Sequence, residues 1–209
     1  MEPVGKSVHS AHDVEMKTTL LQPEHYTRSP WKNGGGIFTD IADVHRAGSA
    51  VKDWDSLLWR FASTPIVAPG PFSYMPGIDR LQMVVGGRGL VLKSPTEEFD
   101  EREPFTTVRF PGEMEIVTAL EGGPVEVVNL MARRGAAEIA LEALREPGER
   151  QLAVGTHLVY AARGDCRIRL GSEEFAIPSE GTLKAELTEP SKLALVAGMA
   201  VLASIRIVG

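Results

Sequence analysis

Arginine, tryptophan and amide side chains gather in four short segments of the first two-thirds of the chain, and this combination could bind a small anion. The first segment reads Pro-Trp-Lys-Asn-Gly-Gly-Gly at residues 30–36. Three glycines expose backbone N–H groups and let a ligand come close, beside a cation and an amide. This loop could therefore hold an anionic or amide-bearing ligand. The structural alternative is a flexible turn into a strand over residues 37–44.

Two further segments place an arginine beside apolar, strand-like sequence. One is Trp-Arg-Phe-Ala-Ser at residues 59–63, and the other is a Pro- and Gly-rich loop, residues 70–78, that leads into Asp79 and Arg80. The fork of an arginine matches the two oxygens of a carboxylate, so both arginines are candidates for carboxylate recognition. The alternatives are a solvated face for Arg60 and a structural ion pair for Asp79 and Arg80.

The fourth segment is Val-Val-Asn-Leu-Met-Ala-Arg-Arg at residues 127–134. Period-two alternation places Asn129, Met131 and Arg133 on one face of a strand. An amide and a cation on one strand face are typical of a lined pocket, or else of an edge face that meets solvent.

The elements that must position these residues are predicted to be short strands. The 209 residues include 21 glycines and 14 prolines, which favours many turns over a helical bundle. Alternation and turn signals predict an all-β sandwich or barrel. A single plausible helix, residues 136–145, is equally readable as a strand. The other predicted strands span residues 37–44, 57–63, 81–85, 90–92, 105–110, 114–120, 125–133, 151–162, 166–170, 173–177, 182–187, 193–196 and 200–208.

Composition also excludes several classes of protein. The net charge of −6 disfavours binding to nucleic acid, which needs a basic face. The single cysteine, Cys166, excludes an internal disulfide framework and a cysteine-cluster metal site. Residues 1–17 are predicted to be a disordered polar tail without the apolar region of a secretory signal. The most apolar stretch, residues 193–203, is too short for a membrane helix of about 20 residues, so a cytoplasmic location without membrane contact is expected.

A faint internal repeat suggests two tandem copies of a small barrel. Leu-x-Met-x-Val-x-Gly at residues 81–87 matches Leu-x-Tyr-x-Ala-x-Gly at residues 158–164, and Phe-Pro-Gly-Glu at residues 110–113 matches Ile-Pro-Ser-Glu at residues 177–180. The alternative is that any two hairpins of an all-β protein look alike.

The strings PWKNGGG, WRFAS, GPFSYMPGIDR and VVNLMARRG, in this order, resemble the HutD/Ves family. The specific motifs cover residues 20–135. The resemblance implies a bicupin, two tandem cupin-like β-barrels of the jelly-roll type with little helix. It also implies an accessory or regulatory role in bacterial histidine utilisation, with no established reaction. The chain departs from the family pattern at Phe38 and Asp40, where many members have Thr and Glu-like residues.

With this resemblance, the chain divides into a first barrel over residues 18–135 that holds the pocket and a second barrel over residues 136–209 with a structural or interface role. The predicted ligand-binding residues are Trp31, Lys32, Asn33, Gly34, Gly35, Gly36, Trp59, Arg60, Ser63, Phe72, Ser73, Asp79, Arg80, Asn129, Met131 and Arg133.

No metal or other cofactor is predicted. Many cupins hold a metal through a His-x-His pair, a glutamate and a third histidine. The five histidines form no such pair, and none lies between residues 51 and 156. No catalytic residue is assigned, because Cys166 fits a buried structural thiol and neither Ser63 nor Ser73 has a histidine close in sequence.

Three functions remain open. The first is a binding protein for a small anionic metabolite, a carboxylate such as urocanate or a formyl- or formimino-glutamate. The second is a metal-free isomerase or hydrolase that acts on such a compound, with Asp79 or His45 as proton carrier. The third is a protein–protein module with a vestigial pocket. A homodimer could form through a barrel edge such as residues 200–208.

Overall fold

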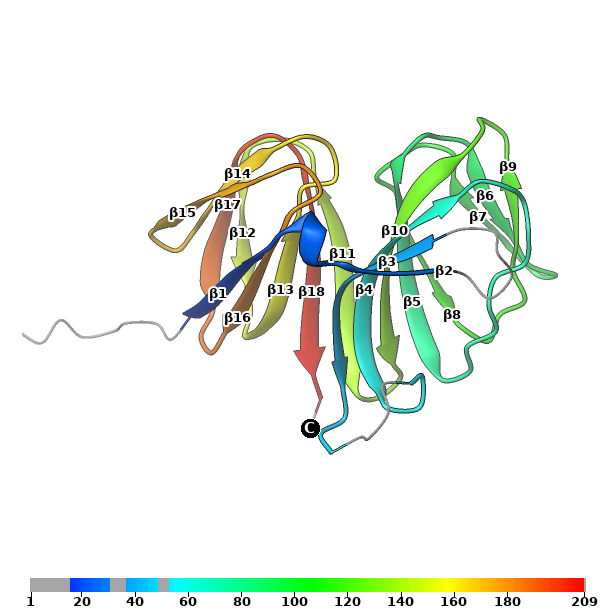
Figure 1. Ribbon diagram of the computed structural model, residues 1–209, viewed down its shortest axis with the longest axis horizontal. Coiled ribbons are helices and arrows are strands. Elements are labelled where there is room, and N and C mark those ends of the chain that lie inside the picture. Colours follow the sequence, from blue (N-terminus) through cyan, green and yellow to red (C-terminus); the bar gives the residue numbers. More distant parts are fainter. Residues whose placement is uncertain (1–15, 31–36, 49–52, 209) are drawn as a thin grey trace, which may run out of the picture.

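The structure is a computed structural model that describes residues 16–30, 37–48 and 53–208. Within these residues the chain is all-β, as predicted, and folds as a bicupin. Its two barrels lie side by side, the first on the right of Figure 1 and the second on the left. No helix in the described part of the chain is long and apolar enough to cross a membrane.

The first barrel consists of a six-stranded sheet, in the order β2-β3-β4-β10-β5-β8, and a three-stranded sheet, β7-β6-β9. Apolar side chains that point inward from both sheets, such as Val84, Leu92 and Val127, form its interior. The strands are β2 (Thr27–Pro30), β3 (Ile37–His45), β4 (Leu57–Ile66), β5 (Ile78–Gly86), β6 (Leu90–Lys93), β7 (Glu98–Glu101), β8 (Thr107–Pro111), β9 (Val117–Leu120) and β10 (Val125–Arg133).

The second barrel consists of a five-stranded sheet, β1-β16-β13-β18-β11, and a four-stranded sheet, β12-β17-β14-β15. Its interior is a separate apolar cluster that includes Ile168, Leu183 and Leu193. The strands are β1 (Met16–Leu21), β11 (Ala137–Leu144), β12 (Gly148–Leu152), β13 (Gly155–Tyr160), β14 (Cys166–Leu170), β15 (Glu173–Ile177), β16 (Thr182–Leu187), β17 (Ser191–Ala197) and β18 (Ala200–Ile207).

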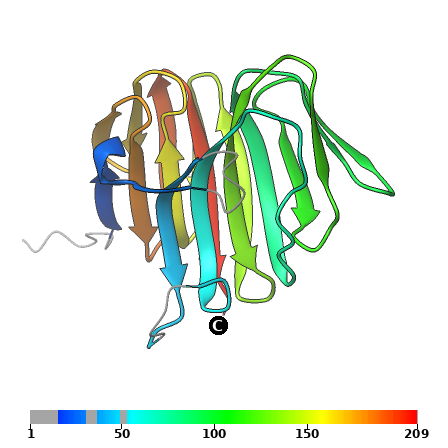
Figure 2. The same ribbon diagram turned by 45° about the vertical axis from the view of Figure 1, so that its right-hand side comes forward.

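The first strand of the chain belongs to the second barrel. β1 pairs antiparallel with β16, from Met16 opposite Leu187 to Leu21 opposite Thr182, and lies beside that strand in Figures 1 and 2. A single 3-10 turn among the described residues, η1 (Pro23–His25), follows β1 before the chain enters the first barrel. Residues 16 and 17, predicted as part of the tail, therefore belong to a strand. Residues 18–21, predicted as part of the first barrel, belong to the second. The rest of the predicted tail, residues 1–15, lies outside the described residues.

The strand order of the first barrel is repeated in the second. The order β4-β10-β5-β8 corresponds to β11-β18-β13-β16, and β7-β6-β9 corresponds to β15-β14-β17. The sequence match between residues 81–87 and 158–164 agrees with this correspondence, because it relates β5 to β13. The match between residues 110–113 and 177–180 does not, because it relates the end of β8 to the end of β15.

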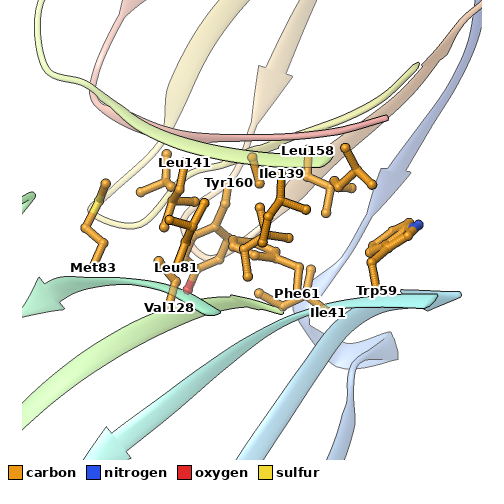
Figure 3. Close-up of a cluster of buried hydrophobic side chains, with 14 of the residues drawn as sticks. Ile41, Trp59, Phe61, Leu81, Met83, Val128, Ile139, Leu141, Leu158 and Tyr160 are labelled. Carbon is orange, nitrogen blue, oxygen red and sulfur yellow. The ribbon is translucent and has the colours of Figure 1, made fainter. Parts of the chain in front are cut away.

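The two large sheets pack face to face between the barrels, as Figure 3 shows. The Phe61 and Tyr160 rings meet edge to face here, with their centres 6.0 Å apart. Each large sheet is therefore buried on both faces, one against its own barrel interior and one against the other barrel. The side chains that meet between the sheets include Trp59, Phe61, Leu81 and Met83 from the first barrel and Ile139, Leu141 and Leu158 from the second.

Three predicted elements differ from the structure or are decided by it. Residues 137–144, readable as helix or strand, form strand β11. The strand predicted over residues 151–162 is two strands of different sheets, β12 and β13, and Gly155 at the start of β13 has a φ of 144°. Residues 200–207 do not form a barrel edge, because β18 is paired on one side with β13 and on the other with β11. The predicted dimer edge at this strand is therefore wrong.

Candidate functional site

A cavity of about 470 Å³ opens into the first barrel, a size typical of small-molecule sites. Its walls come from inward-facing residues of β4, β5 and β10, from the loop between β4 and β5, and from Phe38, Trp54 and Asp55. Six of the residues predicted from the sequence line it, namely Phe72, Ser73, Arg80, Asn129, Met131 and Arg133.

The loop between β4 and β5 leaves the barrel open at the cavity. In the second barrel the corresponding segment includes β12, which pairs with β17 over five residues. In the first barrel the same position beside β9 holds residues 67–77, which form one β-bridge, between Pro71 and Val117. Pro71 and Pro76 have no N–H to donate to a ladder. Residues 71–76 turn along the cavity instead and line it.

Strand register arranges the inward polar residues in rows across the sheet. Met131 of β10 lies opposite Arg60 of β4 and Arg80 of β5. In the next row, Asn129 lies opposite Ala62 on one side and Gln82 on the other. Because side chains two residues apart share a face, the segments around residues 60, 80 and 130, far apart in the sequence, meet at one wall.

Arg80 is the buried cation of this wall. Its side chain is 7% exposed, and Nη2 donates a hydrogen bond to Asn129 Oδ1 at 2.9 Å. The guanidinium carbon lies 4.7 Å from the ring centre of Phe72 and 4.9 Å from that of Phe110, two rings whose own centres are 6.0 Å apart. Burial lowers the pKa of Arg80 to about 10, so it remains a cation at neutral pH. Its Nε has no hydrogen-bond partner among the described residues.

A second buried polar pair lies next to Arg80. Gln82 Nε2 donates to Glu101 Oε2 at 2.7 Å, and neither side chain is exposed. Burial raises the pKa of Glu101 to about 7, while the Gln82 hydrogen bond and the charge of Arg80 act in the opposite direction. Gln82 Oε1, Glu101 Oε1 and Thr64 Oγ1 have no partner within the described residues. Buried polar atoms are normally hydrogen-bonded. Of these residues, Thr64 and Gln82 line the cavity, so a ligand or water there could supply a partner to them.

Arg133 holds part of the cavity rim in place. Its guanidinium donates to the backbone oxygens of Leu57, at 3.1 Å, and of Trp54. These bonds attach the segment that carries Trp54 and Asp55 to the end of β10. Arg133 therefore lines the cavity with part of its donor capacity already used.

Arg60 does not line the cavity. Its Nε forms an ion pair with Asp40 on β3, and its guanidinium lies 5.0 Å from the ring centre of Phe38 and 5.3 Å from that of Trp54. Phe38 and Trp54 do line the cavity. Arg60 therefore contacts two residues of the cavity wall without lining the cavity itself, whereas Arg80 does line it. Phe38 and Asp40, the two departures from the family pattern, are its partners.

Three predicted site residues point away from the cavity. Trp59 and Ser63 lie on the opposite face of β4, where Trp59 is 2% exposed in the core between the barrels and Ser63 donates to Glu126 at 2.5 Å. Asp79 also faces outward and accepts a hydrogen bond from Arg134 Nε at 2.9 Å. The prediction that these side chains line the pocket is corrected, because each is one residue out of phase with the inward face.

The six predicted residues of the glycine loop, Trp31, Lys32, Asn33, Gly34, Gly35 and Gly36, lie outside the described residues. Sequence reasoning missed Thr64, Gln82 and Glu101. Gln82 could have been found from the sequence, because it lies two residues from Arg80 on one strand and therefore shares its face. Glu101 gave none, because it lies on a short strand that was not predicted.

The groups considered for proton transfer have other contacts. In the described ranges, no three His, Cys, Asp or Glu side chains come together as a metal site. His45 Nδ1 is hydrogen-bonded to Ser56 Oγ at 2.8 Å, and its Nε2 lies 2.9 Å from Asp43. Neither His45 nor Asp79 belongs to the cavity wall.

Comparison with protein families gives a match over most of the chain. A family model described as HutD matches residues 23–203. An uncharacterised 21.2 kDa protein in the hutC 3' region of Pseudomonas putida is 27% identical over 155 residues, which cover 74% of this chain and 79% of that protein.

Solved structures share the whole architecture. A conserved protein of unknown function from Pseudomonas aeruginosa PAO1 superimposes with a TM-score of 0.79 at 22% identity, covering 92% of this chain and 100% of that one. HutD from Pseudomonas fluorescens SBW25 superimposes with a TM-score of 0.76 at 21% identity, over the same shares of the two chains. At these identities the likeness establishes the fold.

Proposed function

Because the chain belongs to the HutD family, we propose that it is an accessory or regulatory protein of histidine utilisation that binds a small carboxylate in the cavity of its first barrel. Candidate ligands are urocanate and formyl- or formimino-glutamate. The family supports the association with histidine utilisation, and the chemistry of the cavity supports the class of ligand.

The observation that carries this proposal is the state of Arg80. A buried guanidinium is stable when its donors and its charge are matched. Arg80 has one hydrogen bond, to the neutral Asn129, and a free Nε among the described residues. Two aromatic rings, Phe72 and Phe110, also lie against its guanidinium. A ligand carboxylate would supply the missing acceptor, in the fork geometry that arginine favours.

The test is a calorimetric titration of the protein with urocanate and with N-formyl-L-glutamate. The wild type should bind at least one of them, and Arg80→Met should weaken that binding about 30-fold or more, because a buried charge contact contributes about 2–5 kcal/mol. Arg102→Met is the matched control, since Arg102 is exposed and pairs with Glu121. No binding to the wild type at millimolar ligand, or equal binding to Arg80→Met, would contradict the proposal.

The alternative, a metal-free enzyme acting on the same ligands, has less support. The side chains considered as proton carriers, Asp79 and His45, are engaged outside the cavity wall. An NMR time course of the bound ligand separates the two proposals, because an enzyme consumes it and a binding protein returns it unchanged. The buried thiol Cys166 suits the reducing cytoplasm, which we propose as the place of action.

A further inference from the structure

One wall of the cavity offers a hydrogen-bond acceptor that no described residue uses. Gln82 lines the cavity, and its side chain is fully buried. Its Nε2 donates to Glu101, while its Oε1 is buried and has no partner in the described part of the chain. A buried amide oxygen without a donor is unfavourable. A ligand that donates a hydrogen bond to this oxygen therefore gains more binding free energy than a ligand that does not.

Glu101 determines which atom of the Gln82 amide remains free. An ionised carboxylate only accepts hydrogen bonds, so the NH₂ group of Gln82 must face Glu101. The contact from Nε2 to Oε2 at 2.7 Å has this polarity. Glu101 lies on β7, in the sheet opposite β5, and is fully buried, so it reaches Gln82 from across the barrel interior. The amide oxygen is thus the atom left for another partner.

The free acceptor and the buried cation lie on the same face of one strand. Arg80 and Gln82 are two residues apart on β5, and a strand rises about 3.3 Å per residue. The two side chains are therefore rooted roughly 7 Å apart. Asn129 stands opposite Gln82 and is hydrogen-bonded to Arg80, which closes the wall between them. A small molecule with two polar groups at this separation can reach both.

We propose that Gln82 is a specificity-determining residue that accepts a hydrogen bond from an N–H group of the ligand, with Glu101 as its positioning residue. The proposal rests on the proposed binding of a carboxylate at Arg80. It narrows the ligand class to small carboxylates that also carry an amide-type N–H, and it disfavours those in which an ester oxygen stands in place of that N–H.

Two probes that differ at one position test the proposal. N-acetyl-L-glutamate carries the N–H, and O-acetyl-L-2-hydroxyglutarate has an oxygen in its place. Titration at pH 8, above the raised pKa of Glu101, should show the wild type binding the amide about 10-fold or more tightly than the ester. Gln82→Met should abolish this preference by weakening the amide and leaving the ester unchanged. Glu101→Gln should reduce the preference, because its side chain accepts or donates and no longer fixes the Gln82 amide.

Gln82→Met leaves Glu101 buried without its partner, so the double variant Gln82→Met, Glu101→Leu provides a folded reference with the same expected loss of preference. Equal wild-type affinity for the two probes, or equal losses for both in Gln82→Met, overturns the role of Gln82 and leaves carboxylate binding standing. Failure of the wild type to bind either probe, or any carboxylate, overturns the proposed function and this inference together. Arg80→Met separates the carboxylate-binding proposal from the role of Gln82, because this variant should weaken the binding of both probes alike.

Discussion

The guanidinium of Arg80 donates to the side-chain oxygen of Asn129 at 2.9 Å, and this is its only hydrogen bond to a described residue. Asn129 therefore holds the cation in place without neutralising it. A carboxylate at position 129 would neutralise it, and this difference leads to the first prediction.

Asn129→Asp should weaken carboxylate binding more than 10-fold, because the new side chain pairs with Arg80 and competes with the ligand. The variant should keep or raise the melting temperature, since the buried charge gains a partner. Calorimetry and thermal unfolding measure the two effects. Asn129→Ala is the control, and it should weaken binding only by about 3- to 10-fold by releasing one neutral hydrogen bond of about 1 kcal/mol. Wild-type affinity in Asn129→Asp would contradict the role of Arg80.

Arg60→Ala should weaken binding less than Arg80→Met does, because Arg60 does not line the cavity and contacts only its wall residues Phe38 and Trp54. Asp40→Asn, which removes the charge of its partner, should have a similar small effect. Affinities measured for the three variants with one ligand make the comparison. A loss in Arg60→Ala as large as in Arg80→Met would mean that Arg60 reaches the ligand.

Stability should depend on pH through Glu101. Its folded pKa, about 7, exceeds the ordinary value of 4.5, so the folded state binds the proton more tightly than the unfolded state. The stabilisation is fully present below about pH 4.5, declines as the pH rises, and is lost above about pH 7. It amounts to about 3 kcal/mol at about 1.4 kcal/mol per pH unit. Urea unfolding of the wild type and Glu101→Gln should therefore give similar free energies at pH 4.5 and a more stable variant at pH 8. A difference in unfolding free energy between the two proteins that does not change with pH would contradict the assignment of this pH dependence to Glu101.

Gly112→Ala should disturb the cavity without touching a ligand. A Cβ at this position would lie 2.4 Å from the backbone oxygen of Met75 and 2.9 Å from that of Ile78. The loop that lines the cavity must then move, so binding should fall together with the melting temperature. Gly70→Ala is the matched control, since a Cβ there meets nothing within 4 Å. Unchanged affinity in Gly112→Ala would show that the loop position is unimportant for binding.

Phe61→Ala should destabilise the protein by about 3–5 kcal/mol, because it removes a large side chain from the core between the barrels. Both barrels use this core, so urea unfolding followed by circular dichroism and by tryptophan fluorescence should remain one coincident transition. Two separated transitions would show that the barrels unfold independently.

The alternation of apolar residues and the turn signals between apolar runs predicted most strands. The alternation could not tell which face meets a ligand. Trp59, Phe61 and Ser63 share one face of β4, and that face meets the second barrel. The opposite face, which points into the first barrel, holds Arg60 and Thr64. A sheet with solvent on one side would have shown the difference in its polarity.

Three strands were not predicted because their residues carry little apolar signal. β1, β2 and β7 are short edge strands with exposed or polar side chains. Their place depends on partners that are distant in sequence. The partner of β1 is β16, and Glu101 reaches Gln82 from a strand in which three of the four residues are acidic. The family motifs found Arg80 and Asn129, but the buried pair beside them required the three-dimensional arrangement.

The pairing of β1 with β16 has a consequence for protein synthesis. Every strand of the first barrel lies between residues 27 and 133, so this barrel can close while the ribosome is still making the second. β1 leaves the ribosome first, yet its partner strand is complete only at Leu187. The earliest described strand of the nascent chain must therefore wait, unpaired, until most of the second barrel has been made.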